Sequence, residues 1–232
     1  MTASTNPATS PARASRPTAR AVALLALLLP AAPALAGGSS EAVARSERTL
    51  SAAGVSTLSV EAPVGEFTFT GEARSDVEVR LTVRCERPVK AACRDAARRV
   101  AIDSATRGET LEVEVANWPR RRDDGLHVEL VVALPRDLAL TADLGVGEVE
   151  VSGIDGGIAI DLGVGEVSVR AAESAVRTVS VEVGVGEATL RAGGRVVEGH
   201  GFLGSDLDWK QGTGRAALKV DCGVGEVDVR LE

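Results

Sequence analysis

Apolar and polar residues alternate along most of the chain after residue 56, with the two-residue period of strands that bury one face. The alternation predicts short strands at 57–60, 67–70, 77–84, 110–116, 127–133 and 138–143. Between residues 89 and 100 the period changes, because Val89, Cys93, Ala96 and Val100 recur at helical spacing. The pattern therefore predicts an all-β protein with one short helix near 89–100.

The C-terminal part, residues 143–232, repeats a motif that reads acid-x-Gly-Val-Gly-Glu-apolar. Four copies begin at Asp143, Asp161, Glu182 and Asp221, so successive copies are 18, 21 and 39 residues apart. The last spacing is close to two periods, and we expect a rung without the motif at 201–204. A fainter copy, Pro-Val-Gly-Glu-Phe, occupies 63–67. A period near 20 residues with short alternating strands is typical of stacked repeat proteins.

Each copy also carries two glycines one residue apart, where a bend or a close approach of two backbones requires a residue without a side chain. These structural turns are expected at Gly145, Gly147, Gly163, Gly165, Gly184, Gly186, Gly223 and Gly225. Stacked glycine corners would let rungs approach to about 4.8 Å, the spacing between paired strands. We therefore expect a β-solenoid or β-helix-like stack of short strands with glycine-rich turns. The alternative is an antiparallel sandwich whose hairpin turns share the Gly-Val-Gly sequence.

Residues 1–36 have the composition of a secretory signal peptide. Three arginines precede the apolar run Ala21–Leu29, and Ala-Leu-Ala at 34–36 predicts cleavage after Ala36. A membrane anchor is the alternative, but the apolar run is too short to span a bilayer and ends at a proline. We expect no membrane span after cleavage, an exported chain in the periplasm or outside the cell, a flexible lead-in at 37–56 and a single β-repeat domain at 57–232.

Composition and charge narrow the function classes. Aromatic residues make up only 2% of the 232 residues, which suits a narrow core filled by Val, Ala and Leu. The leader holds three arginines and no acid, so the remaining chain has 23 basic and 33 acidic residues, a formal net charge of −10. Nucleic acids and anionic lipids need a basic surface, so we expect neither as a partner.

Export implies an oxidising compartment, in which the three cysteines can form disulfides. Cys85 ends a predicted strand and Cys93 lies in the first turns of the predicted helix, so a Cys85–Cys93 disulfide is the preferred pairing. Two buried free thiols are the alternative. Cys222 remains unpaired and is expected to be a small buried residue, with an intermolecular link as the other reading.

The repeats, the leader and the Val-rich strands together resemble a known bacterial family. The Gly-Val-Gly-Glu-Val-x-Val copies are similar to those of uncharacterised β-strand-repeat proteins called putative adhesins, which are grouped with the toast-rack domains of cell-envelope stress proteins. The resemblance covers most of 57–232, and the segment 85–125 departs from it. It implies an envelope-facing β-repeat fold without an established enzymatic activity, so no catalytic residues are carried over.

Motifs of enzyme chemistry are missing from the sequence, and we expect no catalytic residues, metal or cofactor. His127 and His200 are far apart in sequence and match no metal-binding pattern, so each is expected to be a lone surface histidine. Trp118 and Trp209 are expected to plug loop or rung ends rather than to stack on sugars. The basic run Arg120–Arg122 is expected to be a solvated loop, with contact to anionic envelope polymers as the alternative.

The acidic residues of the motif form the one constellation that suggests a ligand. If the rungs stack in register, Glu148, Glu166, Glu187 and Glu226 form one ladder, and Asp143, Asp161, Glu182 and Asp221 form another. Carboxylates on glycine-rich turns are ligands that Ca²⁺ accepts, although the Gly-Gly-x-Gly-x-Asp consensus of calcium-binding solenoids is not matched. The simpler interpretation is that these acids are solvated turn residues.

Three functions remain open from the sequence. The first is a non-enzymatic, adhesin-like envelope scaffold that binds a protein or a surface polymer. The second is a polysaccharide-active enzyme on a short β-helix, with Asp206 and Asp208 as acid and base. The third is a structural module that self-associates through an exposed C-terminal strand, Val227–Leu231.

Overall fold

Twelve strands and one helix make up the part of the chain that the computed structural model describes, residues 40–119, 125–201 and 203–232. The elements are β1 (Ser40–Ser51), β2 (Thr57–Glu72), β3 (Asp76–Glu86), α1 (Ala91–Ala97), β4 (Ala101–Arg107), β5 (Thr110–Ala116), β6 (Leu126–Pro135), β7 (Ala139–Ser152), β8 (Ile158–Ala171), β9 (Val176–Ala192), β10 (Arg195–Glu198), β11 (Ser205–Trp209) and β12 (Ala216–Leu231). The expected all-β class and the single short helix are confirmed. The predicted leader and Arg120–Arg122 lie outside the described residues.

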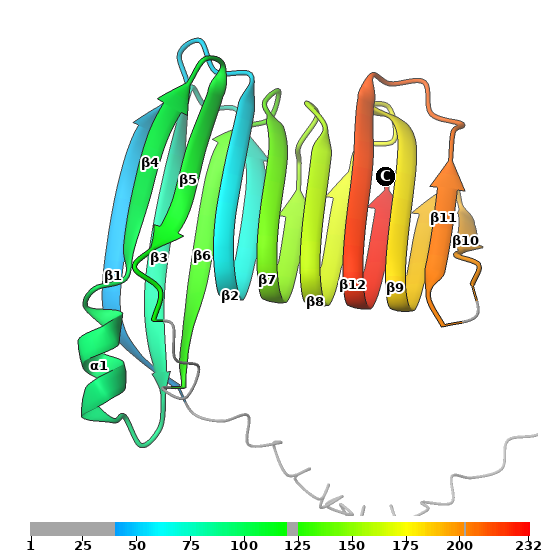
Figure 1. Cartoon of the computed structure of the whole chain (residues 1–232). Helices are drawn as coiled ribbons and strands as arrows, with labels where there is room; N and C mark the ends of the chain where they lie inside the picture. The colour runs from blue at the N-terminus through cyan, green and yellow to red at the C-terminus, as the bar shows by residue number, and fades with distance from the viewer. Residues whose placement is uncertain (1–39, 120–124, 202) are drawn as a thin grey trace, which may run out of the picture. The chain divides into compact units, whose positions relative to one another are not determined.

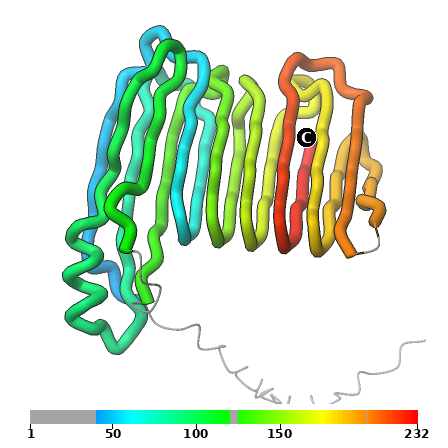
Figure 2. Tube along the Cα trace, in the orientation of Figure 1, coloured from blue at the N-terminus to red at the C-terminus, as the bar shows by residue number. Residues whose placement is uncertain are grey.

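Five long strands form the centre of the fold. They lie side by side in the order β2-β7-β8-β12-β9, all parallel, and each descends, bends and ascends again (Figures 1 and 2). The structure places the repeat glycines at these bends. Their register is continuous, because Gly65 pairs with Gly147, Gly147 with Gly165, Gly165 with Gly225, and Gly225 with Gly186. The fainter copy at 63–67 is thus the first member of the same stack.

The core lies between the two arms of the bent strands and is built from columns of apolar side chains. One column of the descending arms consists of Ala62, Leu144, Leu162, Cys222 and Val183. One column of the ascending arms consists of Phe67, Val149, Val167, Val227 and Ala188. All ten side chains are almost fully buried. Because the alternation changes phase across Gly-Val-Gly, both arms turn their apolar face inward.

The position of β12 differs from the expectation for the C-terminal copy. We expected the fourth copy to follow a rung at 201–204, but Gly201, Leu203 and Gly204 lie between β10 and β11, which both pair antiparallel with β9. The chain then returns over β9 and inserts β12 between β8 and β9. The expectation of an exposed C-terminal strand is therefore wrong, since Val227–Leu231 has a hydrogen-bonded neighbour on each side.

The connectivity also tests the two expected architectures and excludes one of them. The central strands are parallel, which removes the antiparallel sandwich. The strands belong to one open twelve-stranded sheet that has antiparallel pairs toward both ends, and this arrangement does not by itself establish a β-solenoid. The short strands expected around each motif are also merged, because the extended chain continues through the bend.

The N-terminal end of the sheet corrects a second expectation. Residues 37–56 were expected to be a flexible lead-in, but Ser40–Ser51 forms β1, which pairs antiparallel with β3. None of its side chains is fully buried, so the apolar alternation that marks the other strands is weak here. Hydrogen bonds to β3 hold this segment in place, together with the partly buried side chains of Val43, Ala44 and Leu50 that pack against the core.

The helix and its disulfide close the same end of the sheet. Cys85 near the end of β3 and Cys93 in α1 form a disulfide, as preferred from the sequence, and both side chains are buried. Ala96 and Ala97 provide the other buried residues of the helix. The bond thus ties α1 to the edge region of the sheet.

Replacing Cys85 and Cys93 together with alanine is expected to lower the free energy of unfolding by about 2.5 kcal/mol, because the eight-residue separation closes a short loop in the unfolded chain. Urea unfolding followed by tryptophan fluorescence, with and without reductant, measures the effect. The Cys222→Ala variant is the control and should keep the wild-type response to reductant. A wild-type unfolding midpoint that reductant leaves unchanged would contradict the expectation.

Candidate binding surface

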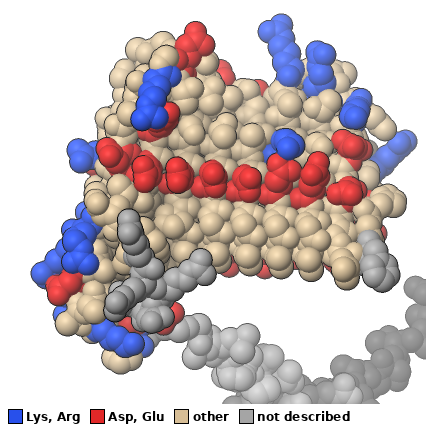
Figure 3. All heavy atoms as spheres, viewed as in Figure 1, with Lys and Arg blue, Asp and Glu red and all other residues tan. Residues whose placement is uncertain are grey.

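A row of carboxylates crosses the descending arms of the strands, and we call it the front acidic row. The register aligns Glu61, Asp143, Asp161, Asp221 and Glu182 on five adjacent strands. The row continues beyond the repeats, because Glu114 pairs with Glu61, Asp103 with Glu114, and Asp206 with Glu182. Figure 3 shows it as a continuous line of acidic side chains across the molecule.

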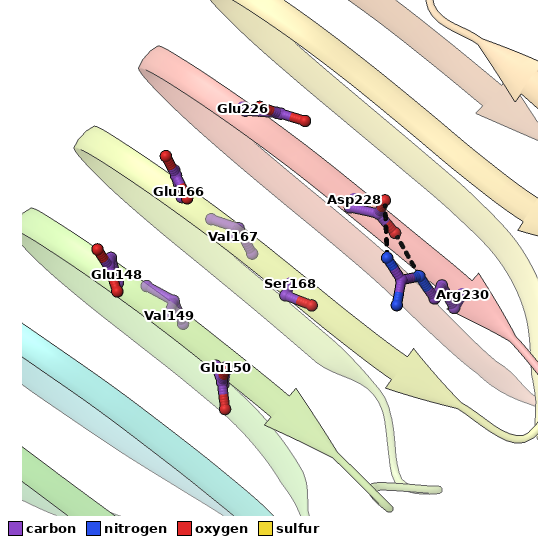
Figure 4. A pocket seen from close by; sticks show the side chains of 9 residues that line it. All are labelled: Glu148, Val149, Glu150, Glu166, Val167, Ser168, Glu226, Asp228 and Arg230. Atoms are coloured by element: carbon purple, nitrogen blue, oxygen red, sulfur yellow. Dashed lines mark hydrogen bonds and ion pairs between the residues drawn. The ribbon is translucent and has the colours of Figure 1, made fainter. Parts of the chain in front are cut away.

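A second row, the back acidic row, lies on the ascending arms just after the bends. It contains Glu129, Glu66, Glu148, Glu166, Glu226 and Glu187. Glu148, Glu166 and Glu226 border a shallow open hollow of about 240 Å³, where they stand side by side on three strands (Figure 4). Each of the two ladders expected from the sequence is thus present as a row, one on the descending arms and one on the ascending arms.

Cations compensate these rows only at a few points. Arg84 contacts Glu129, with Nη2 and Oε2 2.8 Å apart, and Lys219 Nζ lies 2.8 Å from Asp221 Oδ2. Asp228, which lies in the hollow but in neither row, accepts hydrogen bonds from Arg230 Nη2 at 3.4 Å and from Arg191. Like charges on directly opposed residues destabilise a sheet. The rows are therefore an electrostatic cost that the packed core of the stack offsets.

The field of the front acidic row acts on its nearest cation. The hydrogen bond from Lys219 to Asp221 raises the pKa of the Lys219 ammonium above its ordinary value of 10.5, and the charges of Asp221, Glu182 and Asp161 raise it further. Because the folded pKa is raised, the pair stabilises the fold below the ordinary lysine pKa. This contribution is lost as the pH rises through the raised pKa.

Substitution of Asp221 by asparagine is expected to lower the pKa of Lys219 toward 10.5, because it removes both the charged hydrogen-bond acceptor and the largest charge near the ammonium. The lysine side-chain NMR signals, followed from pH 9 to 12, report this pKa. Asp208→Asn serves as the control, since Asp208 contacts Lys210 instead. An unchanged Lys219 titration in Asp221→Asn would show that the row does not act on it.

The calcium reading gains no support from the arrangement of the side chains. Within the described residues, no group of three or more His, Cys, Asp or Glu is placed to hold a metal ion. The members of each row are spread one to a strand, so they form a line and not a cage. Calcium also takes six to eight oxygen ligands, which a single line of carboxylates does not supply.

The residues considered for enzyme chemistry are not brought together. Asp206 and Asp208 are exposed on the same face of β11, and Asp208 accepts a hydrogen bond from Ser180. His200 bridges to Asp206 through backbone hydrogen bonds only. His127 lies on β6, far from these residues, because β6 is five places in the strand order from β9, the strand with which β11 pairs.

The remaining singled-out residues have structural places. Trp209 is buried at the end of β11, and Trp118 packs partly buried against the core. Cys222 is buried and free, and burial raises the pKa of its thiol. It fills the column between Leu162 and Val183, as a small apolar residue would.

The members that extend the acidic rows were not found by sequence reasoning. Asp103, Glu114 and Glu129 belong to strands without the motif. Glu114 and Glu129 pair with Glu61 and Glu66, which are distant in the chain, and Asp103 joins the row through Glu114. Alternation alone indicates that they point outward, but the sequence does not give the register. Only the repeat motif, present on five strands, allowed the centre of each row to be aligned.

The free edges of the sheet have features that oppose further strand pairing. β1 contains an irregularity between Ala42 and Ala44, and the exposed charge of Arg48 lies opposite buried Val79. At the other end, β10 and β11 have only four and five residues. Bulges, charged side chains and short strands are the means by which proteins protect sheet edges.

Comparison with known proteins supports the fold. No protein-family model matches the sequence, and no curated protein matches it. The one helix among the described residues, α1, does not have the length and apolarity needed to cross a membrane. The solved structure of a "putative adhesin" from Bacteroides fragilis matches at 10% identity, over 80% of this chain and 97% of that chain, with a TM-score of 0.32 that carries no argument.

A second solved structure matches better. It is that of a "putative cell adhesion protein" from Clostridium sporogenes, which aligns over 82% of this chain and 99% of that chain, with a TM-score of 0.51 and 14% identity. At this identity the match speaks for the fold alone. The chain therefore has a fold similar to that of the Clostridium sporogenes protein, in agreement with the resemblance of its repeats to those of the putative adhesins.

Proposed function

We propose that this chain is an exported, non-enzymatic protein of the cell envelope, a β-solenoid-like scaffold that binds a protein or a surface polymer. The observation that carries the proposal is the pair of acidic rows on a rigid stack. Eight carboxylates in the front acidic row and six in the back acidic row are held in register at the spacing of paired strands, about 4.8 Å. Such a surface presents a regular array of charge for recognition.

The placement in the envelope has independent support. The sequence at 1–36 reads as a secretory leader, and the Cys85–Cys93 disulfide is typical of oxidising compartments. The fold is similar to that of the "putative cell adhesion protein" from Clostridium sporogenes. These three features agree with a place in the periplasm or at the cell surface.

Neither alternative function is favoured by a specific observation. Asp206 and Asp208 share one exposed face of one strand, whereas a glycosidase places its two carboxyl groups on opposite sides of a scissile bond. Self-association through the C-terminal strand lacks a free edge at β12. A binding scaffold needs neither feature.

Retention of the mature chain, residues 37–232, on immobilised envelope fractions tests the proposal. We expect salt-sensitive retention that falls when Asp143, Asp161 and Asp221 are all replaced with asparagine, because exposed charges are screened by ions. A variant with Asp95, Glu109 and Asp137 neutralised removes the same charge from exposed residues outside both acidic rows, and it should still be retained.

Two results would overturn the proposal. One is retention no stronger than that of an unrelated protein of the same net charge. The other is release of reducing sugar ends from envelope polysaccharide by the mature chain, which would identify the enzyme alternative instead.

A further inference from the structure

Exposed apolar side chains are concentrated at the bends between the two acidic rows. Val146, Val164, Val224 and Val185 are between 37% and 50% exposed, and they stack in register together with the partly exposed Val64. We call these five residues the valine ridge. Among the described residues, the other large exposed apolar side chains are Leu203 and Val196. Leu203 adjoins the end of the ridge, because its carbonyl accepts a hydrogen bond from Gly186.

The ridge is a continuous apolar strip with acidic borders. Four of its valines lie between two glycines that add no side chains, and the fifth, Val64, lies between Pro63 and Gly65. In each rung the front acidic row lies three residues before the valine and the back acidic row lies two residues after it. With about 4.8 Å between rungs, the five valines span roughly 19 Å.

The charge on both borders excludes several occupants. A second copy of this chain placed ridge to ridge would bring four acidic rows together, and like charges in such a contact are strongly unfavourable. Anionic lipid and nucleic acid are repelled for the same reason. The complementary partner has an apolar stripe with cationic side chains along both of its sides.

The spacing of the ridge distinguishes between the forms that such a partner segment can take. An α-helix advances about 5.4 Å per turn, so its apolar stripe presents one turn to each rung of about 4.8 Å. An extended strand repeats its same-face side chains every 6.6–6.8 Å or so and drifts out of step after one rung. Lysine and arginine side chains on either side of a helical stripe are long enough to reach past the valines to both acidic rows.

We propose that the valine ridge is the docking surface for a basic amphipathic helix of a partner protein, which lies along the stack with its apolar stripe on the valines. The inference rests on the proposed function and specifies the partner class and the part of the surface that it contacts. A span of roughly 19 Å corresponds to about 13 helical residues. Apolar contact at the ridge fixes the position, and the acidic rows supply attraction and orientation.

The test uses the mature chain and two synthetic 18-residue peptides of the same Leu and Lys composition. In one the leucines line up on a helix face, and in the other the order is scrambled. We expect the aligned peptide to bind the wild type roughly tenfold more tightly than the scrambled peptide, measured by calorimetry. The triple variant Val146→Thr, Val164→Thr and Val224→Thr should lose this preference, since it keeps β-branched side chains but makes them polar.

The matched control is Val196→Thr, which makes the same change at an exposed valine of β10 outside the ridge and should keep the preference. Circular dichroism melting checks that each variant is folded. If the triple variant does not fold, the single Val164→Thr variant at the centre of the ridge should weaken the preference by a measurable fraction.

Equal binding of both peptides to the wild type would overturn the inference, because the acidic rows alone would then account for the attraction. An unchanged preference in a folded ridge variant would overturn it as well. Envelope retention separates the two proposals. If retention persists while the peptide preference is absent, only the docking inference fails. If the preference is found but the envelope fractions do not retain the wild type, only the proposed function fails.

Discussion

Replacing Gly165 with alanine is expected to destabilise the protein by more than about 4 kcal/mol or to prevent folding, an unusually large effect for one methyl group. Gly165 has a φ of +146°, which side-chain-bearing residues rarely adopt. An added Cβ would also overlap the carbonyl oxygen of Gly147 and lie 2.8 Å from its carbonyl carbon. Neither backbone is free to yield, because each is paired with a neighbouring strand on both sides.

The Gly108→Ala variant separates the two causes. Gly108 has a φ of +60°, but a Cβ there would meet no atom within 4 Å. Its substitution carries only the backbone cost, about 1 kcal/mol. Urea unfolding of the two variants and the wild type gives the comparison. Similar losses at both positions would mean that the bend conformation, and not the close approach of stacked rungs, determines the need for glycine.

This close approach explains why the repeat could be interpreted from sequence. Two glycines at a fixed offset from a carboxylate mark the positions where backbones meet, and the same positions pair in the structure. The apolar alternation on either side indicated the buried columns for the same reason, since Val149 and Val167 occupy equivalent places. The disulfide could also be predicted from the sequence, because a strand end and a helix start eight residues apart bring Cys85 and Cys93 together.

The order of the strands could not be obtained in this way. The motif copies on β8, β12 and β9 are nearly identical, so each offers its neighbours the same glycines and the same apolar columns. The local sequence therefore does not indicate whether β12 lies between β8 and β9 or at the end of the stack. The crossover distinguishes them, because Gly214 donates to the Val176 carbonyl and Arg177 Nε to the Gly214 carbonyl, which ties this segment to the start of β9. These contacts join residues nearly 40 positions apart and leave no periodic mark in the sequence.

The acidic rows depend on both kinds of information. Their centres follow from the motif, whereas their ends follow from strands that the motif does not reach. Asp206 extends the front acidic row because β11 pairs with β9, and Glu129 extends the back acidic row because β6 pairs with β2. The candidate surface is therefore a property of the assembled sheet.

Replacing Lys219 with proline is expected to cost at least about 3 kcal/mol, because Lys219 lies inside β12 and is paired on both sides, with Ala159 on β8 and with Ser180 on β9. Proline cannot donate to a ladder and is tolerated only at the edge of a sheet. The side chain of Lys219 is exposed, so loss of packing contributes little. The Lys219→Ala variant measures the small part of the effect that comes from the contact with Asp221.

The Ser104→Pro variant provides the matched comparison on an edge strand. Ser104 lies in β4, which pairs only with β5, and its amide donates a hydrogen bond to the side chain of Asp103. Its replacement by proline should therefore cost much less than that of Lys219, as measured by urea unfolding. If the two variants lose equal stability, or if Lys219→Pro unfolds like the wild type, β12 does not occupy the central position. Because β12 joins β8 to β9, disruption of its ladder should destabilise the whole stack and not only the C-terminal end. The urea unfolding curve should therefore shift as a single cooperative transition.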